Sequence, residues 1–416
     1  MTKRAPTGWL AVAALAGWSA YSTLSIMYVA FGVALLASGW ALTRAGRWRE
    51  VAAEPGARPL ALLWLWLAVS ALWSPAARSD MVPHLWSITL LGAVPLMALA
   101  LPPAAARLGL KHFVWASAAA AALIVLARLG VLPRWPVWQR VVDGEGNQRI
   151  AVSMWLALGA AFAVHRASLP GAMRQRLTSL ALAVLCLCGE ASQDRRSGML
   201  MLLALLVLWI WWQQPTALRR AGVLLVLALA GWGLWTVADG VRARFAEGVH
   251  ELRTLQPADT VSTSWGQRAY MLQISARLVA ERPLIGHGLG SWPTLWERHT
   301  PPGSALRAHS TPHNEYLLLA VQGGVPAALL WLAVWVSRLR ACWRAGAAAL
   351  PAAQVWLTLA LGSLFNAILR DAKFELTLLL LAALATAATR SPQSMGQARN
   401  PSAADPGRDA PSSSPR

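Results

Sequence analysis

Long apolar stretches separated by short polar ones recur along most of the chain. Most of them approach the roughly 20 consecutive apolar residues that an α-helix needs to cross the hydrocarbon core of a bilayer. The composition agrees, because 56% of the residues are hydrophobic and only 13% are charged, whereas charged residues make up about 25% of a soluble domain. The pattern predicts an all-α integral membrane protein.

About twelve apolar segments are predicted to span the membrane as helices. In chain order they are Gly8–Tyr21, a second that ends near Leu42, Leu60–Trp73, Pro83–Leu101, His112–Leu129, Ile150–Val164, Leu177–Gly189, Ser197–Trp212, Ala221–Val237, His313–Val336, Ala352–Leu369 and a last one that ends at Ala388. Residues 1–238 therefore hold nine spans, residues 239–312 form one large extramembrane segment, and residues 313–389 hold three spans. Residues 390–416 are rich in Ser, Pro, Ala and Gly and are expected to be a disordered tail.

The positions of the basic residues indicate how these helices are threaded. Basic loops tend to stay on the cytoplasmic side, and the bias is counted over short loops. With a cytoplasmic N-terminus, short segments on that side hold 20 Lys and Arg residues, and short segments on the other side hold 9. Both termini are therefore predicted to be cytoplasmic, with residues 239–312 facing the periplasm or exterior. The cytoplasmic loops account for about half of the positive charge behind the net charge of +19, so no nucleic-acid partner is expected.

Two arginines lie at the predicted outer mouth of the membrane region. Arg195 and Arg196 occupy a loop between two spans that is too short to need solubilising charge. Charged residues at membrane depth are costly and usually face a partner or a water-filled cavity. One interpretation is a guanidinium clamp that binds a phosphate or pyrophosphate bidentately. The alternatives are snorkelling toward lipid headgroups or pairing with Asp194 or Glu190.

The long extramembrane segment is predicted to contain two helices. Asp239–Leu255 has apolar residues at helical spacing, which is typical of an amphipathic helix on a membrane surface. Trp265–Glu281 is predicted as the second helix and carries Arg268 and Gln273. The glycine-rich stretch Pro283–Trp292 could cradle a phosphate with backbone N–H groups. Because it faces the exterior, where nucleotides are scarce, we expect a tight turn against the membrane surface instead.

One histidine lies where the long segment returns to the membrane. Pro312 fits the start of a helix and Thr311 suits its N-cap, so a span is predicted to begin here. His313 can act as a general base near neutral pH, and a helix N-terminus favours its neutral form. Glu315 is close enough in sequence to orient the ring. The alternative is a solvated or hydrogen-bonded structural histidine, which position alone favours.

The sequence shows no pattern of ligands for a required metal. Its eight histidines include no HExxH spacing, and its three cysteines have no spacing typical of a metal site. We therefore expect neither a metal nor a cofactor.

Three short motifs on this layout resemble the O-antigen ligase and polymerase superfamily, whose fold is similar to the GT-C-type membrane glycosyltransferases. They are a His-Asn-x-x-Leu motif, an arginine in a short outer loop, and an arginine ahead of a Pro-x-x-Gly-x-Gly stretch. The matching residues are His313, Asn314 and Leu317 for the first, Arg195 or Arg196 for the second, and Arg268 ahead of Pro283, Gly286 and Gly288 for the third. The doubled arginine leaves the second match open, and the Ser-Gly pair that follows favours Arg196.

The resemblance implies glycosyl transfer on the periplasmic face of a bacterial inner membrane. The donor would be a polysaccharide on undecaprenyl pyrophosphate, and the acceptor a sugar hydroxyl of lipid A–core, in lipopolysaccharide biosynthesis. His313 would deprotonate the acceptor while Arg196 and Arg268 hold the departing pyrophosphate, so that transfer inverts the sugar and needs no metal. Four further residues are assigned to substrate binding: Arg195, Asn314, Glu315 and Gln273.

Three other functions fit parts of the pattern. An O-antigen polymerase would use the same donor but a second lipid-linked glycan as acceptor. Protein O-oligosaccharyltransferases resemble the ligases but commonly carry a further large exterior region, whereas a short cytoplasmic tail is expected here. A solute transporter would be expected to have broken helices with polar residues near the midplane. The charges here cluster at the outer mouth, which favours an enzyme.

Overall fold

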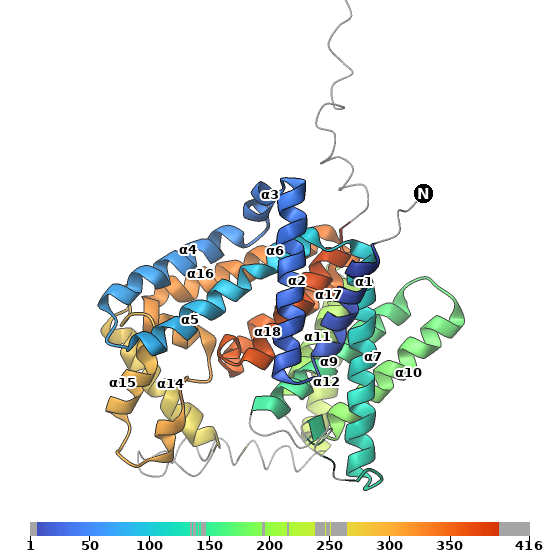
Figure 1. Cartoon of the computed structure of the whole chain (residues 1–416). Coiled ribbons are helices and arrows are strands. Elements are labelled where there is room, and N and C mark those ends of the chain that lie inside the picture. The colour runs from blue at the N-terminus through green and yellow to red at the C-terminus, as the bar shows by residue number, and fades with distance from the viewer. Residues whose placement is uncertain are drawn as a thin grey trace, which may run out of the picture.

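A computed structural model describes residues 6–133, 135, 139, 141–142, 147–193, 196–213, 216–237, 246, 250 and 264–390. The chain over these residues is a bundle of helices (Figure 1), and each apolar segment expected to span a membrane forms helix. Six of the described helices are long and apolar enough to cross a membrane. The prediction of an all-helical, multi-pass membrane protein is therefore confirmed, while the number of spans stays a prediction.

The helices fall into two groups along the chain. The first group comprises α1 (Thr7–Ser19), α2 (Leu24–Ala45), α3 (Trp48–Ala53), α4 (Ala57–Ser70), α5 (Arg78–Leu91), α6 (Ala93–Ala100), α7 (Pro103–Arg128), α9 (Asn147–Ser168), α10 (Met173–Ala191), α11 (Arg196–Gln213) and α12 (Ala217–Val237). The second comprises α14 (Ser264–Glu281), α15 (Ser291–His299), α16 (Glu315–Ala345), α17 (Leu350–Phe365) and α18 (Ala372–Ala388). Short 3₁₀ turns connect helices in both groups: η1 (Ala71–Trp73) in the first, and η2 (Ala305–Ala308), η3 (Ala347–Ala349) and η4 (Ile368–Arg370) in the second.

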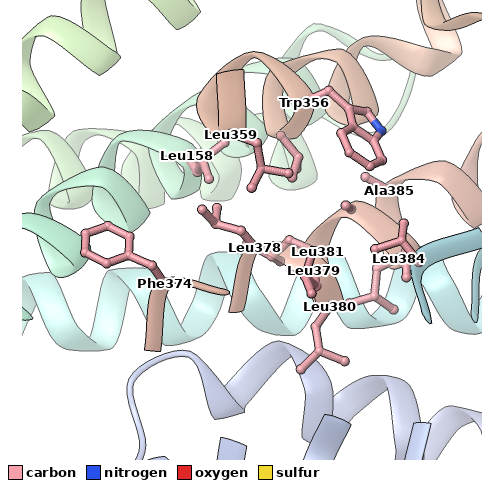
Figure 2. Close-up of a cluster of buried hydrophobic side chains, with 14 of the residues drawn as sticks. Leu158, Trp356, Leu359, Phe374, Leu378, Leu379, Leu380, Leu381, Leu384 and Ala385 are labelled. Carbon is pink, nitrogen blue, oxygen red and sulfur yellow. The ribbon is translucent and has the colours of Figure 1, made fainter. Parts of the chain in front are cut away.

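Helix α18 lies at the centre of the bundle and is buried over almost its whole length. It packs against α6, α7 and α17. Leu378 and Leu381 of α18 meet Trp356 and Leu359 of α17 in one apolar cluster (Figure 2). A helix that is apolar on every side must be surrounded by other apolar groups. Its position follows directly from its composition.

Small residues allow the helices around α7 to approach closely. A Cβ atom on Gly109 of α7 would lie 2.8 Å from the carbonyl oxygen of Ala13 in α1, and one on Gly189 of α10 would lie 2.6 Å from Cβ of Ala121 in α7. Both distances are too short for an added carbon. Association through small residues is typical of membrane helices, where contact area rather than the hydrophobic effect holds neighbours together.

Helix α16 is broken, and the glycine-rich loop fills the break. Gly324 has non-helical backbone angles (φ 72°, ψ −179°) within α16. The carbonyls freed there are capped from other elements: Val321 O accepts His287 N at 2.8 Å, Gln322 O accepts Gly288 N at 2.8 Å, and Gly323 O accepts Trp66 Nε1 at 2.6 Å. Val325 N in turn donates to Pro283 O at 2.7 Å. The loop is a tight turn, as expected, but it lies against α16.

The described helices of the long segment have an apolar core of their own. The rings of Trp292 and Trp296 in α15 stack with their centroids 5.0 Å apart. Residues from α14, α15 and the first half of α16 surround them: Met271, Ile274, Leu278, Leu295, Leu318 and Val321. This core fixes α14 beside the start of α16, and Figure 1 shows α14 and α15 together at one end of the bundle.

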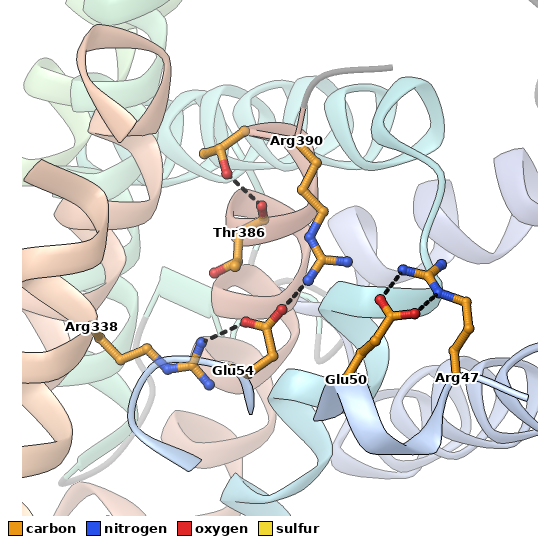
Figure 3. Close-up of polar contacts among 7 residues, drawn as sticks. Arg47, Glu50, Glu54, Arg338, Thr386 and Arg390 are labelled. Atoms are coloured by element: carbon orange, nitrogen blue, oxygen red, sulfur yellow. Dashed lines mark hydrogen bonds and ion pairs between the residues drawn. The ribbon is translucent and has the colours of Figure 1, made fainter. Parts of the chain in front are cut away.

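An ion-pair cluster joins the C-terminal parts of α16 and α18. Glu54, which follows α3, accepts from Arg338 Nη1 of α16 at 3.3 Å and also pairs with Arg390, just beyond α18 (Figure 3). Beside it, Arg47 donates to both carboxylate oxygens of Glu50 at 2.6 Å. These residues come from segments that the sequence assigns to the cytoplasmic side. The contacts agree with the prediction that these segments share one side of the membrane. The orientation of the protein in the membrane stays a prediction.

Some boundaries differ from those predicted. The fourth span begins at Arg78 rather than at Pro83, which lies within α5. Pro83 is the sixth residue of α5, where its missing N–H removes one helical hydrogen bond without ending the helix. Residues 48–53 form the short helix α3 inside a predicted loop. Apart from residues 246 and 250, the predicted amphipathic helix Asp239–Leu255 lies outside the described residues, as does the predicted tail beyond Arg390.

Replacing Gly286 by alanine is expected to destabilise the protein more than replacing Gly303. Both glycines have left-handed backbone angles (φ 65° and 79°), which cost an L-residue about 1–2 kcal/mol. A Cβ on Gly286 would also lie 2.5 Å from the carbonyl of Gln322, whereas one on Gly303 would meet nothing within 4 Å. Overpacking adds about 1–3 kcal/mol. Apparent melting temperatures in detergent measure the difference, and equal losses would contradict the tight fit of the loop in α16.

Candidate functional site

His313 lies at the end of the long segment in a strained conformation. Its φ of 50° makes it the sole non-glycine residue with a positive φ in the part of the chain that the structure describes. A left-handed histidine costs on the order of 1–3 kcal/mol, and such residues cluster at functional sites. The left-handed residue changes the direction of the chain just before α16, so His313 is not part of the helix.

Asn366 holds the His313 ring. His313 Nδ1 and Asn366 Oδ1 are 3.0 Å apart, and Asn366 Oδ1 also accepts Ala367 N at 3.0 Å. Asn366 follows α17, and its side chain is buried with 4% exposure. Its Nδ2 has no hydrogen-bond partner among the described residues, a loss that costs about 1–3 kcal/mol for a buried donor. The contact joins the two segments that precede α16 and α18.

A second histidine contacts the same ring, and the charge of an arginine acts on it. His309 Nδ1 lies 3.4 Å from His313 Nε2, and the two rings meet nearly edge-on with centroids 5.3 Å apart. Burial lowers the pKa of His313; the hydrogen bond to Asn366 opposes this shift, and the charge of Arg268 on α14 lowers the pKa further. Burial also lowers the pKa of His309. The site therefore favours neutral imidazole near neutral pH.

Arg268 lies on the face of α14 that is not in the apolar core. More than a third of its surface is accessible, yet its surroundings lower its pKa through desolvation. Its electrostatic effect on His313 shows that the two side chains are within range of each other. The structure thus brings together two of the predicted site residues, 45 positions apart in the sequence.

Asn314 is the N-cap of α16. Its Oδ1 accepts Leu317 N at 2.9 Å, and its Nδ2 donates to Leu364 O at 3.1 Å. The helix therefore begins at Glu315, two residues later than predicted, and Asn314 rather than Thr311 is the cap. Asparagine is among the best N-cap residues because its oxygen satisfies an otherwise unpaired N–H. The Asn and Leu of the His-Asn-x-x-Leu motif are the two ends of this bond.

Glu315 points away from His313 into a buried polar cluster. It is fully buried, and its Oε2 accepts Leu369 N at 3.2 Å. Arg370 lies within electrostatic range of Glu315 and Glu375, and its Nη2 donates to His84 O at 2.9 Å. The expected orienting contact to His313 thus comes from Asn366. Glu315 instead stabilises the turn that presents Asn366.

The remaining predicted residues are placed less fully. Gln273 is exposed on α14. Arg196 is the first residue of α11, its side chain lies outside the described part, and Arg195 is not among the described residues. Gln322, which sequence reasoning passed over, accepts Gly290 N at 2.8 Å and contacts His84 Nδ1 at 2.9 Å. The proposed substrate contacts of Gln273, Arg195 and Arg196 stay predictions.

Two residues of the site were not singled out from the sequence. Asn366 has a weak signal, since it is a polar residue that closes an apolar helix on the same predicted side as His313. His309 is one of several histidines in the long segment. It lies four positions before His313 but outside any predicted helix, so this spacing did not single it out. Among the described residues, no group of three or more His, Cys, Asp or Glu side chains could hold a metal ion.

The fold and this cluster define a multi-pass membrane protein with a histidine, an asparagine and an arginine gathered at one end of its bundle. Residues 181–332 match the family model described as O-antigen ligase. This part of the chain is an O-antigen ligase domain. It includes Arg268 and His313 but ends before Asn366. No curated protein matches the chain.

Replacing Asn314 by alanine is expected to lower stability by about 1 kcal/mol or more, because the N-cap is lost. Asn314→Asp keeps an oxygen for Leu317 N but loses the donor to Leu364 O, so a smaller loss is expected. Apparent melting temperatures in detergent test the order. Unchanged stability in both variants would show that capping is not the role of Asn314.

Proposed function

We propose that the protein is an O-antigen ligase. In this proposal it transfers a polysaccharide from undecaprenyl pyrophosphate to a sugar hydroxyl of lipid A–core, at the periplasmic face of a bacterial inner membrane. The observation that carries the proposal is the half-buried His313, held by Asn366 at 3.0 Å and within electrostatic range of Arg268, inside an O-antigen ligase domain. A base and a cation in one site are what this transfer requires.

His313 acts as the general base in the proposed reaction. Its neutral imidazole takes the proton of the acceptor hydroxyl as the oxygen attacks the anomeric carbon of the donor. A new C–O bond forms while the bond from that carbon to the pyrophosphate oxygen breaks. Attack opposite the leaving group inverts the anomeric carbon. A depressed pKa keeps His313 in the proton-accepting form at the pH of the periplasm.

Arg268 stabilises the negative charge that collects on the departing undecaprenyl pyrophosphate. A guanidinium binds such oxygens bidentately, and a fixed cation near the leaving group lowers the barrier most where water is scarce. Arg196, with Arg195, is proposed to add positive charge from the start of α11. Because these arginines can neutralise the leaving group, the proposed transfer is independent of metal, and we expect EDTA to leave its rate unchanged.

An O-antigen polymerase is the nearest other function of the same family. Reconstitution in vesicles with the lipid-linked glycan separates the two. A ligase forms a larger lipid A–core glycolipid only when lipid A–core is added. A polymerase lengthens the lipid-linked glycan in its absence. Lengthening alone would overturn the ligase proposal.

Replacing His313 by asparagine is expected to lower the rate of transfer by about 10²–10⁴-fold, the contribution typical of a general base. Asparagine tolerates a left-handed backbone better than other non-glycine residues, so this variant separates loss of the imidazole from loss of the turn. Glycolipid formation in the reconstituted assay is the measurement. An active His313→Asn variant at normal abundance would overturn the assignment.

Replacing Arg268 by alanine is expected to lower the rate by about 10²-fold or more, as for removal of one group that stabilises transition-state charge. Arg277 provides a matched control, because it is an exposed arginine nine residues further along α14 and so lies on the opposite side of the helix. We expect Arg277→Ala to keep near-normal activity. Equal effects of the two changes would indicate a general role of charge.

A further inference from the structure

We propose that Asn366 is a positioning residue that holds His313 with its proton on Nδ1 and its Nε2 lone pair free to accept the hydroxyl proton. The inference rests on the proposed function and adds a residue outside the O-antigen ligase domain, which ends at residue 332. It is carried by three hydrogen-bonding groups whose chemistry leaves one arrangement.

The first step identifies the atom of Asn366 that faces His313. Ala367 N lies 3.0 Å from Asn366 Oδ1, and a backbone N–H can only donate. The amide group at that contact must therefore present its oxygen, because an NH₂ group there would set two donors against each other. The orientation of the Asn366 side-chain amide is thus fixed by the backbone N–H of Ala367.

The second step assigns the proton on His313. Asn366 Oδ1 is an acceptor and lies 3.0 Å from His313 Nδ1, so Nδ1 carries the hydrogen. A neutral imidazole has one N–H, which leaves the lone pair on Nε2. Burial keeps the ring neutral by lowering the pKa of His313. The atom available to take a proton is therefore Nε2.

The charged and titratable groups around the ring agree with this assignment. His309 Nδ1 lies 3.4 Å from His313 Nε2, a weak contact that an incoming hydroxyl can replace. Arg268 approaches from α14 and disfavours a second proton on the ring. Asn366 is the sole oxygen acceptor that the described residues supply to His313.

The burial of Asn366 also points to this role. Its side chain is 4% exposed, and its Nδ2 lacks a hydrogen-bond partner among the described residues. An apolar side chain at that position would avoid the unpaired donor. Its oxygen accepts from Ala367 N within the turn and also contacts His313 Nδ1, so the residue can orient the imidazole from a fixed position.

The test compares Asn366→Ala and Asn366→Asp in the reconstituted transfer assay. Alanine removes the acceptor, so kcat is expected to fall about tenfold or more because the base is misaligned, with little change in KM for the lipid-linked donor. It also removes the bond that raises the pKa of His313, so the acid limb of the pH–rate profile moves to lower pH. Aspartate keeps an acceptor, so kcat is expected to return toward the unmodified protein's value at pH values above the acid limb. Its charge raises the pKa of His313 and moves the limb to higher pH.

Opposite shifts of the limb in the two variants are the result that supports the proposal. Ser363→Ala serves as the control, because Ser363 is a buried polar residue of α17 that bonds only its own helix; it should leave both kcat and the limb unchanged. Equal losses of kcat in Asn366→Ala and Asn366→Asp with an unmoved limb would show a structural role and overturn the inference. Normal pH–rate profiles in both variants would also overturn the inference. An active His313→Asn variant would instead remove the proposed function itself.

Discussion

The structure depends on satisfying the backbone where α16 is interrupted at Gly324. A break in a buried helix exposes carbonyls that water cannot reach, and each unpaired group would cost several kcal/mol in a membrane. The loop of residues 283–290 provides two of the missing donors and accepts one in return, and Trp66 of α4 provides the third donor. That exchange joins the extramembrane helices to the bundle. A broken helix is also the feature that a transporter would use to bind a solute. Here other groups of the protein bond the free backbone at the break.

Much of the fold could be predicted because a bilayer demands long apolar helices. The positions of the apolar segments and the helix Trp265–Glu281 follow from composition and spacing. Pro83 misled the prediction, because proline limits but does not forbid the first turns of a helix. The break at Gly324 was not predicted. The apolar run around Gly323, Gly324 and Pro326 does not indicate which distant loop would bond the backbone groups that a break leaves free.

The candidate site shows the same division between local and distant information. His313, Asn314 and Arg268 belong to short motifs, so the sequence could single them out. The cap formed by Asn314 is a local contact that the motif did not predict, because a motif gives residue types without contacts. The assignment of Asn314 to substrate binding stays a prediction. The partner of His313 comes from 53 positions away. Asn366 can be identified only from the tertiary contact between the segments that precede α16 and α18.

The hydrogen bonds around residues 313–315 reach forward to the connection between α17 and α18. His313 meets Asn366, Asn314 donates to Leu364, and Glu315 accepts from Leu369. All three partners lie beyond residue 332, where the recognisable domain ends. That domain is therefore a unit of sequence kinship but not of folding. Exchanged alone between two related proteins, it would bring the histidine into a foreign setting, so a functional chimera must carry the last two helices with it.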